Sequence, residues 1–268
     1  MNASCPIGLF DSGVGGLSVW REVVRRLPHE ATVYFADSAH CPYGSRPADE
    51  IRAISAAIVR FLLEQECKLI VVACNTASAA ALDSLRAEFN VPIVGMEPAL
   101  KPAAEATQTG HVGVLATAGT LNGNLFKNTT QRHANGVEVH VQVGEGLVEQ
   151  VEAGRLNTPA TEALLRQYLE PMLAANVDQI ALGCTHYPLL MPLVQRIVAG
   201  RAQIIDPAQA VARQVQRSLM RHNLETPAGC VAYHQFYTTG QRQTLQNLLS
   251  LFSQQPVKVT WVEAFTQF

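Results

Sequence analysis

One pattern occurs twice in the chain, a short apolar run that ends at a cysteine and is followed by two polar residues. The first copy is LIVVACNTAS at residues 69–78, and the second is QIALGCTHYP at residues 179–188. Branched apolar runs of this length, bounded by a polar break, are typical of buried strands in a parallel sheet. The segments after the runs can form helices. Cys74 and Cys184 are therefore predicted at the carboxyl ends of strands, where open α/β sheets place their ligands.

A second pair of segments favours an internal duplication. GLFDSGVGGLS at residues 8–18 is similar to GVLATAGTLNG at residues 113–123, and the offset between them is close to the offset between the two cysteines. Repetition at a nearly fixed offset is typical of a duplicated structural unit. If the two units face each other, the thiols of Cys74 and Cys184 point at one ligand from opposite sides.

The remaining chain alternates strands and helices, so the predicted class is α/β. Further strands are expected at residues 6–10, 32–36, 92–95, 112–115, 138–143 and 203–205. Helices are expected up to Leu27, at 48–66, 146–153 and 158–175, and from about Leu189 and Pro207. We expect two similar α/β lobes, one formed by residues 1–96 with 207–268 and the other by residues 97–206. Asp206 is positioned to cap the helix that opens at Pro207.

Composition excludes several classes of protein. The 268 residues are 48% hydrophobic and 16% charged, with a formal net charge of −2 and no Lys/Arg block, so a nucleic-acid surface is not expected. The longest apolar runs are well short of a membrane span, and the first ten residues lack the features of a signal peptide. The six cysteines show no CxxC spacing. We therefore expect a cytoplasmic protein with reduced thiols.

Two thiols on opposite faces of a ligand suit one reaction in particular. Removing a proton from a carbon next to a carboxylate and returning it to the opposite face inverts that centre, and this requires a base on one face and an acid on the other. A thiol has an ordinary pKa of about 8.5, which a helix N-terminus lowers. Either cysteine alone is more readily interpreted as a small buried hydrophobe. The matched pair favours acid/base chemistry.

Each thiol also needs polar neighbours. Asp11 ends the first strand and lies beside Cys74 if the two strands are adjacent, and His186 is two residues from Cys184. An isolated Asp-Ser-Gly is more often a turn, and an isolated His more often structural; their positions at strand ends favour function. Further hydrogen-bond donors for carboxylates, which could equally be helix caps, are Ser12, Asn75, Thr76, Thr117 and Thr185. The glycines that follow Asp11 let backbone N–H groups approach an anion.

No cofactor is expected. Pyridoxal phosphate needs a Schiff-base lysine, and none of the four lysines lies in a motif. There is no Walker loop, and DSGVGG is not the GxGxxG of dinucleotide-binding folds. Zinc could in principle bind Cys74, Cys184 and His186, but ligands scattered in this way lack the spacing of a zinc motif.

Four segments together resemble the aspartate/glutamate racemase family. They are FDSGVGGLSV at residues 10–19, FADSAHCPYGSRP at 35–47, VVACNTAS at 71–78 and LGCTHYPLL at 182–190. The resemblance runs over essentially the whole chain. It implies two pseudo-symmetric three-layer α/β domains with mostly parallel sheets and an active site in the cleft between them.

The resemblance also implies roles for individual residues. Cys74 and Cys184 are the acid/base thiols, Asp11 assists the first, and His186 with Glu152 assists the second. Glu149, one helical turn from Glu152, is the alternative to it. Substrate-binding residues implied by the family are Asp11, Ser12, Tyr43, Gly44, Asn75, Thr76, Thr117, Thr185 and His186.

The implied reaction is cofactor-independent racemisation of L-glutamate to D-glutamate for peptidoglycan biosynthesis. The CNTAS and CTHYP forms favour glutamate over aspartate, which other members of the family racemise. The alternatives are an aspartate racemase and a non-enzymatic protein that uses the paired thiols for redox chemistry or ligand binding. Expected partners are the small-molecule substrate and a cell-wall-precursor nucleotide as activator, with the chain acting as a monomer or homodimer.

Overall fold

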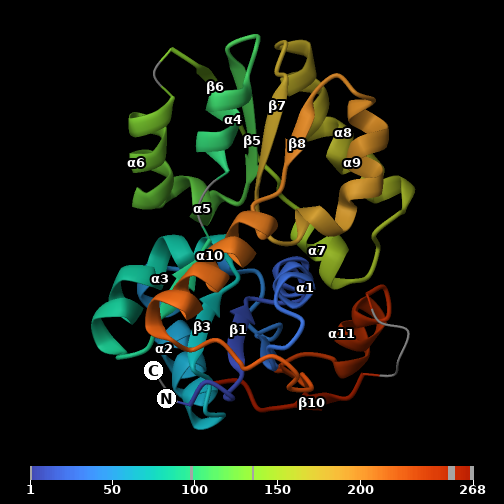
Figure 1. Ribbon diagram of the computed structural model, residues 1–268. Helices are drawn as coiled ribbons and strands as arrows, with labels where there is room; N and C mark the ends of the chain where they lie inside the picture. Colours follow the sequence, from blue (N-terminus) through green and yellow to red (C-terminus); the bar gives the residue numbers. More distant parts are fainter. Residues whose placement is uncertain (1, 97–98, 135, 253–256, 266–268) are drawn as a thin grey trace.

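The computed structural model describes residues 2–96, 99–134, 136–252 and 257–265. Its strands form two sheets, and every neighbouring pair in the described residues is parallel, as predicted for an α/β protein. Figure 1 shows the second sheet above the first, with helices packed around both. Among the described residues, no helix has the length and apolar character needed to cross a membrane.

The first sheet has six strands in the order β10-β9-β2-β1-β3-β4. These strands are β1 (Ile7–Asp11), β2 (Thr32–Ala36), β3 (Leu69–Val72), β4 (Ile93–Gly95), β9 (His234–Thr238) and β10 (Val259–Trp261). The helices associated with them along the chain are α1 (Leu17–Arg26), α2 (Ala48–Glu64), α3 (Asn75–Glu88), α10 (Ala208–His222) and α11 (Arg242–Leu249), with a 3₁₀ turn η1 (Tyr43–Ser45).

The second sheet has four strands in the order β6-β5-β7-β8. They are β5 (His111–Ala116), β6 (Glu138–Val143), β7 (Gln179–Gly183) and β8 (Gln203–Ile205). The associated helices are α4 (Leu100–Ala106), α5 (Ala118–Asn122), α6 (Asn124–His133), α7 (Leu147–Glu152), α8 (Pro159–Ala174) and α9 (Met191–Val198), with a 3₁₀ helix η2 (Tyr187–Leu190). Helices α4, α5 and α6 were not among the elements predicted from the sequence.

The central strands are largely apolar because both of their faces are covered. Every residue of β1, β2, β3 and β7 is buried. In β1, Leu9 packs into one hydrophobic cluster with Val23 of α1, and Phe10 packs into another with Ile58 of α2. A strand buried on both faces needs no polar alternation, and this explains the continuous apolar runs in the sequence.

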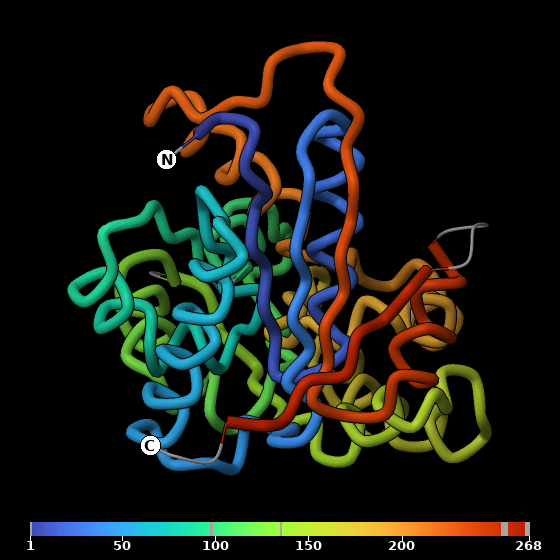
Figure 2. The backbone as a smooth tube through the Cα atoms, turned by 90° about the horizontal axis from the view of Figure 1, so that it is seen from below, coloured from blue at the N-terminus to red at the C-terminus, as the bar shows by residue number. Residues whose placement is uncertain are grey.

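The two sheets share one strand order, and this agrees with the predicted duplication. Across the first sheet the order is β2-β1-β3-β4, and across the second it is β6-β5-β7-β8. In both, the spatial order is the second, first, third and fourth strand of that half along the chain. The first sheet is extended by the C-terminal part of the chain, because β9 pairs with β2 and β10 pairs with β9. Figure 2 shows β9 running beside β2, with β1 on the other side of β2.

The C-terminal part returns to the first sheet through α10, which packs against α1. The Asp206 carboxylate accepts a hydrogen bond of 2.9 Å from the backbone N–H of Ala208, the first residue of this helix, but the N-cap position itself is held by Pro207. The division into domains at 96/97 and 206/207 stays a prediction, and residues 97 and 98 lie outside the described residues.

Candidate active site

The two cysteines follow corresponding strands of the two sheets. Cys74 comes after β3 and caps α3, where its Sγ accepts a hydrogen bond of 3.5 Å from the Ala77 backbone N–H. Cys184 comes after β7, but the next element is the 3₁₀ helix η2, and α9 begins only at Met191. A helix thus opens directly behind Cys74, and the helix predicted from about Leu189 begins at Met191, after the 3₁₀ helix.

Both cysteines line one small cavity. Its volume is about 10 Å³, which is close to the room that a single water molecule needs. All the predicted substrate-binding residues except Asp11 line it, together with two that the sequence did not single out, Pro42 and Val148. Loops from both sheets thus close over a common space between the two thiols.

Asp11 lies on the Cys74 side of the cavity, since β1 and β3 are neighbours in the sheet. The Cys74 thiol donates to Ser12 Oγ at 3.7 Å, and Ser12 Oγ donates to Asp11 Oδ1 at 3.5 Å. The Asp11 carboxylate also accepts from the Gly16 backbone N–H at 2.7 Å and from Thr185 Oγ1 at 3.4 Å. Asp11 is thus bonded to both halves of the site, whereas the sequence associated it with the first thiol alone.

Burial dominates the protonation of the first thiol. It raises the pKa of Cys74 well above the ordinary value, and the charge of nearby Asp11 raises it further. The hydrogen bond from Ala77 at the start of α3 acts in the opposite direction but is outweighed. The start of α3 lowers this pKa as expected, but the net pKa is raised, because the buried thiolate has lost its solvation. Burial also raises the pKa of Asp11.

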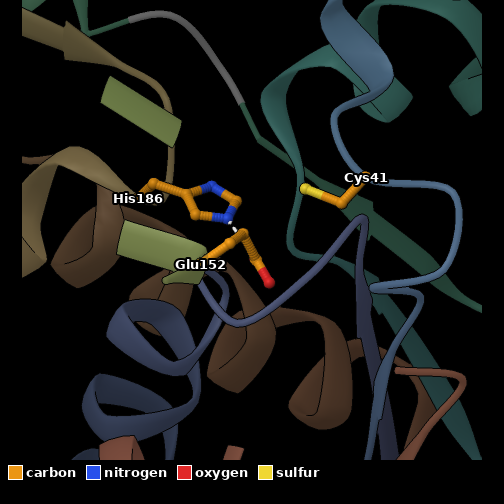
Figure 3. Close-up of side chains that lie close together, drawn as sticks. All are labelled: Cys41, Glu152 and His186. Atoms are coloured by element: carbon orange, nitrogen blue, oxygen red, sulfur yellow. Dashed lines mark hydrogen bonds and ion pairs between the residues drawn. The ribbon is translucent and has the colours of Figure 1, made fainter. Parts of the chain in front are cut away.

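The second thiol is served by a histidine and a glutamate. His186 Nδ1 lies 3.7 Å from Cys184 Sγ, and His186 Nε2 lies 2.7 Å from Glu152 Oε1 (Figure 3). Glu152 also accepts hydrogen bonds from the Val14 backbone N–H at 2.7 Å and from Ser38 Oγ at 3.2 Å. Glu149 is exposed, so Glu152 is the carboxylate in contact with His186.

His186 and Glu152 stabilise each other's charged forms. Burial alone lowers the pKa of His186, but hydrogen bonds with Cys184, Cys41 and Glu152 outweigh it and hold the pKa well above the ordinary value. Burial works against the Glu152 carboxylate, yet its bonds to His186 and Val14 lower its pKa. His186 is therefore a cation whose Nδ1 lies 3.7 Å from Cys184 Sγ.

The glycine loop after Asp11 packs against this pair. A Cβ atom at Gly13 would collide with Glu152 Oε1, and one at Gly15 would collide with the His186 ring. The anion that this loop approaches is therefore part of the protein itself. It is the Glu152 carboxylate, which accepts a hydrogen bond from the Val14 N–H. This close approach ties the first half of the molecule to residues of the second.

Cys41 is a third cysteine near His186 and Glu152. From the sequence it was expected only to be one of six reduced cysteines. It comes from the loop after β2, and Figure 3 shows its side chain directed toward His186 and Glu152. Burial raises its pKa to about 12. Only the docking of the loop against residues from the second half brings it there, so no local signal in the sequence could have indicated it.

The remaining polar groups connect the halves or face the cavity. Thr76 Oγ1 and Thr117 Oγ1 are 2.9 Å apart across the junction, and Thr117 also caps α5. Tyr43 is held by a hydrogen bond of 2.7 Å that its hydroxyl donates to Asp37. Asn75 Nδ2 is buried and has no hydrogen-bond partner among the described residues. A buried donor of this kind is suited to binding a carboxylate of a ligand.

The zinc ligands considered from the sequence do not form a set. Within the described residues, the groups close enough to share a metal ion are Cys41 with Glu152 and His186, and His111 with Glu138 and His140. Neither group contains Cys74 or Cys184. In the first group the 2.7 Å between His186 Nε2 and Glu152 Oε1 is a charged hydrogen bond, shorter than the roughly 3.3 Å between two ligands of one zinc ion.

Comparison with known proteins gives one consistent result. The sequence pattern of the family described as Asp/Glu/Hydantoin racemase matches residues 7–215. The glutamate racemase of Roseiflexus sp. (strain RS-1) is 52% identical over 250 residues, which cover 91% of this chain and 90% of that protein.

Two solved structures extend the comparison. The glutamate racemase of Escherichia coli in complex with L-glutamate and the activator UDP-MurNAc-ala has a TM-score of 0.85 and 32% identity, covering 97% of this chain and 99% of that one. The glutamate racemase of Francisella tularensis in complex with D-glutamate has a TM-score of 0.84 and 28% identity, covering 98% of each chain.

Proposed function

The chain belongs to the Asp/Glu/Hydantoin racemase family, and we propose that it interconverts L- and D-glutamate by proton transfer at Cys74 and Cys184. The observation that carries this proposal is that two buried thiols, from corresponding strands of the two sheets, line one cavity. D-glutamate made in this way supplies peptidoglycan synthesis, and we place the reaction in the cytoplasm.

The two thiols divide the work of inverting the α-carbon. In one direction the Cys184 thiolate, stabilised by protonated His186, removes the α-proton and becomes a thiol. The Cys74 thiol then gives its proton to the opposite face and becomes a thiolate. In the reverse direction the roles are exchanged. No atom is gained or lost, since one proton leaves the carbon and one returns.

Hydrogen-bond donors on the cavity wall hold the carboxylates of the substrate. The unpartnered Asn75 amide and the hydroxyls of Thr76, Thr117 and Thr185 are positioned for this. Charge that develops on the α-carboxylate during proton removal is stabilised by such preorganised donors. A cavity of about 10 Å³ is far smaller than glutamate, so the loops from the two sheets have to separate for the substrate to enter.

The direct test is circular dichroism of purified protein with L-glutamate, with and without added pyridoxal phosphate, and with L-aspartate in parallel. We expect the signal of L-glutamate to decay to zero without the cofactor. Decay with aspartate alone would favour the aspartate alternative. An unchanged signal at high protein concentration would leave only a redox or ligand-binding role for the thiols.

A nucleotide activator is supported by a groove beside the site. The groove has a volume of about 1370 Å³, and Gly44 and Thr76 line both it and the cavity. Arg213, Arg217 and Arg221 are spaced four residues apart on α10, so they share one helix face toward the groove, where they suit a diphosphate. UDP-MurNAc-ala, the activator named for the Escherichia coli protein, is the ligand to test.

We expect UDP-MurNAc-ala to raise the racemisation rate of the wild-type protein and Arg217→Gln to weaken that response. Arg166→Gln, on the outer face of α8, is the matched control and keeps the full response. A wild-type rate that is independent of the nucleotide would contradict the regulatory proposal and leave the racemase proposal intact. Sedimentation of the same samples tests the predicted monomer or homodimer.

A further inference from the structure

Three potential metal ligands lie together at the end of the second sheet that is remote from the cavity. His111 is the first residue of β5, and Glu138 and His140 lie in the first half of β6. Residues two apart on a strand point to the same face, so the side chains of Glu138 and His140 are neighbours. The register of the parallel pair places His111 directly opposite Glu138. Strand pairing therefore brings all three side chains to one face.

The distances between the ligand atoms are those of a metal site. His111 Nδ1 lies 3.1 Å from His140 Nε2. Glu138 Oε2 lies 3.6 Å from His111 Nδ1, and Glu138 Oε1 lies 3.4 Å from His140 Nε2. Two ligands about 2.1 Å from a tetrahedral zinc ion are separated by about 3.4 Å. The printed separations are near this value, and one ligand atom from each of the three residues lies within 4.8 Å of the other two.

Solvent reaches the triad without any opening of the fold. The exposed fractions of the side chains are 33% for His111, 66% for Glu138 and 22% for His140. An ion can enter from solvent, bind the three side chains and keep water at its remaining position. The His186–Glu152 pair differs in distance and in exposure. Its atoms are only 2.7 Å apart and its side chains are largely buried, as in an ion pair.

We propose that His111, Glu138 and His140 bind a divalent transition-metal ion, and Zn²⁺ is the ion used to test this. Two imidazoles and a carboxylate suit zinc and its neighbours in the first transition row and do not suit Mg²⁺ or Ca²⁺, which prefer oxygen ligands. The ion takes the place of the proton that the two rings share in their hydrogen bond. It joins β5 to β6, which is an edge strand held by one neighbour only in the described sheet.

The site lies at the amino end of β5, whereas the residue that follows the carboxyl end of β5, Thr117, lines the cavity. Occupancy therefore stabilises the second sheet without contact with the substrate. A ligand that binds only the folded state raises the melting temperature. We expect Zn²⁺ to raise the Tm of the wild-type protein.

The experiment titrates Zn²⁺ against a chromogenic chelator in the presence of wild-type protein and of His111→Gln, Glu138→Gln and His140→Gln. Each variant should hold one ion fewer per chain or bind it at least tenfold more weakly, and should lose the rise in Tm. His133→Gln is the matched control, since His133 is an exposed histidine at the end of α6 in the same half. It should bind as the wild type does.

Cobalt separates this site from the cysteines. The difference spectrum between Co²⁺-loaded wild type and His140→Gln should lack the thiolate-to-cobalt charge-transfer band, because no sulfur belongs to the triad. Circular dichroism of the metal-free variants verifies that they fold. Equal zinc binding by the wild type and all three variants, or a thiolate band in the difference spectrum, would overturn the proposal. Neither result bears on the racemase reaction.

Discussion

The halves of the molecule that carry Cys74 and Cys184 have the same strand order but different chemistry. In both, the thiol follows the third strand of the common order, β3 in one and β7 in the other. Around Cys74 lie Ser12 and Asp11, and the thiol caps an α-helix. Around Cys184 lie His186 and, behind it, Glu152, and no α-helix begins there.

The two thiols also differ in the neighbouring groups that act on their protonation. Burial and the Asp11 charge hold the pKa of Cys74 high, which favours a neutral thiol able to donate. Cys184 instead has an imidazole 3.7 Å away whose own pKa is raised, so the group beside this thiol is a cation. Two equal groups therefore occupy corresponding positions in the two sheets, while neighbours that are not duplicated give them different surroundings.

The largest effect is expected from removing either thiol. Cys74→Ser and Cys184→Ser should each lower kcat for racemisation by at least about 10³-fold, because a hydroxyl is far too weak an acid to replace a thiol. Each variant keeps one base, so it should eliminate a leaving group from a suitable glutamate analogue in one enantiomer only. Racemisation is followed by circular dichroism and elimination by product analysis. If both variants process both enantiomers equally, the assignment of one thiol to each face is wrong.

Asp11→Asn and His186→Asn test whether each neighbour serves its own thiol. Each should lower kcat by roughly 10²-fold. Asp11→Asn should slow the direction in which Cys74 is the base more than the reverse, because an asparagine cannot take up a proton from Cys74 through Ser12. His186→Asn should show the opposite bias. The ratio of kcat/KM in the two directions is fixed by equilibrium, so the asymmetry is sought in kcat, KM and isotope effects. Identical isotope effects for the two variants would mean that Asp11 and His186 only bind the substrate and do not assist proton transfer.

Alkylation of the substrate-free protein compares the two thiols directly. Cys74 should react with iodoacetamide about tenfold more slowly than Cys184, because burial and the Asp11 charge raise the pKa of Cys74 and the thiolate is the reactive form. His186→Asn should remove most of this difference by slowing Cys184 and leaving Cys74 unchanged. Peptide mass spectrometry of a time course gives both rates in one sample. Faster labelling of Cys74 would contradict the resting states assigned here.

Glu152→Gln should lower the pKa of His186, since it removes a charged hydrogen-bond partner that favours the imidazolium. The measurement is a pH titration of the histidine ring signals by NMR. Glu149→Gln is the control, because Glu149 is exposed and three residues away in the same helix. An equal shift in both variants would mean that the 2.7 Å bond has no particular role.

A smaller effect is expected on stability. The folded pKa of Glu152 is lowered from 4.5, so its contribution is present above pH 4.5 and is lost as the pH falls through the lowered value. The folded pKa of His186 is raised from 6.5, so its contribution is present below pH 6.5 and is lost as the pH rises through the raised value. Glu152→Gln should therefore cost most between those values, about 2 kcal/mol, in urea unfolding measured across pH. A cost independent of pH would point to lost packing.

The fold was largely predictable because its strands are determined locally. A strand buried on both faces needs a continuous apolar run, and the runs ending before Cys74 and Cys184 have no other ready interpretation. The similarity of the segments at 8–18 and 113–123 indicated the repeat, which the common strand order now agrees with. Helices α4, α5 and α6 were missed; α4 and α5 have only seven and five residues, which are too few to show a helical period.

In the site, the sequence by itself determined which residues stand at the ends of the strands, because that position follows from where each apolar run stops. It could not determine what burial does to the pKa of Cys74, nor that Cys41 lies beside His186, since both depend on loops docked from distant parts of the chain. The bond from Val14 to Glu152 spans 138 residues. The His111, Glu138 and His140 triad likewise exists only through the register of two strands. Local patterns specify strands, whereas distances between side chains of different strands and loops are set only when the sheets pair and pack.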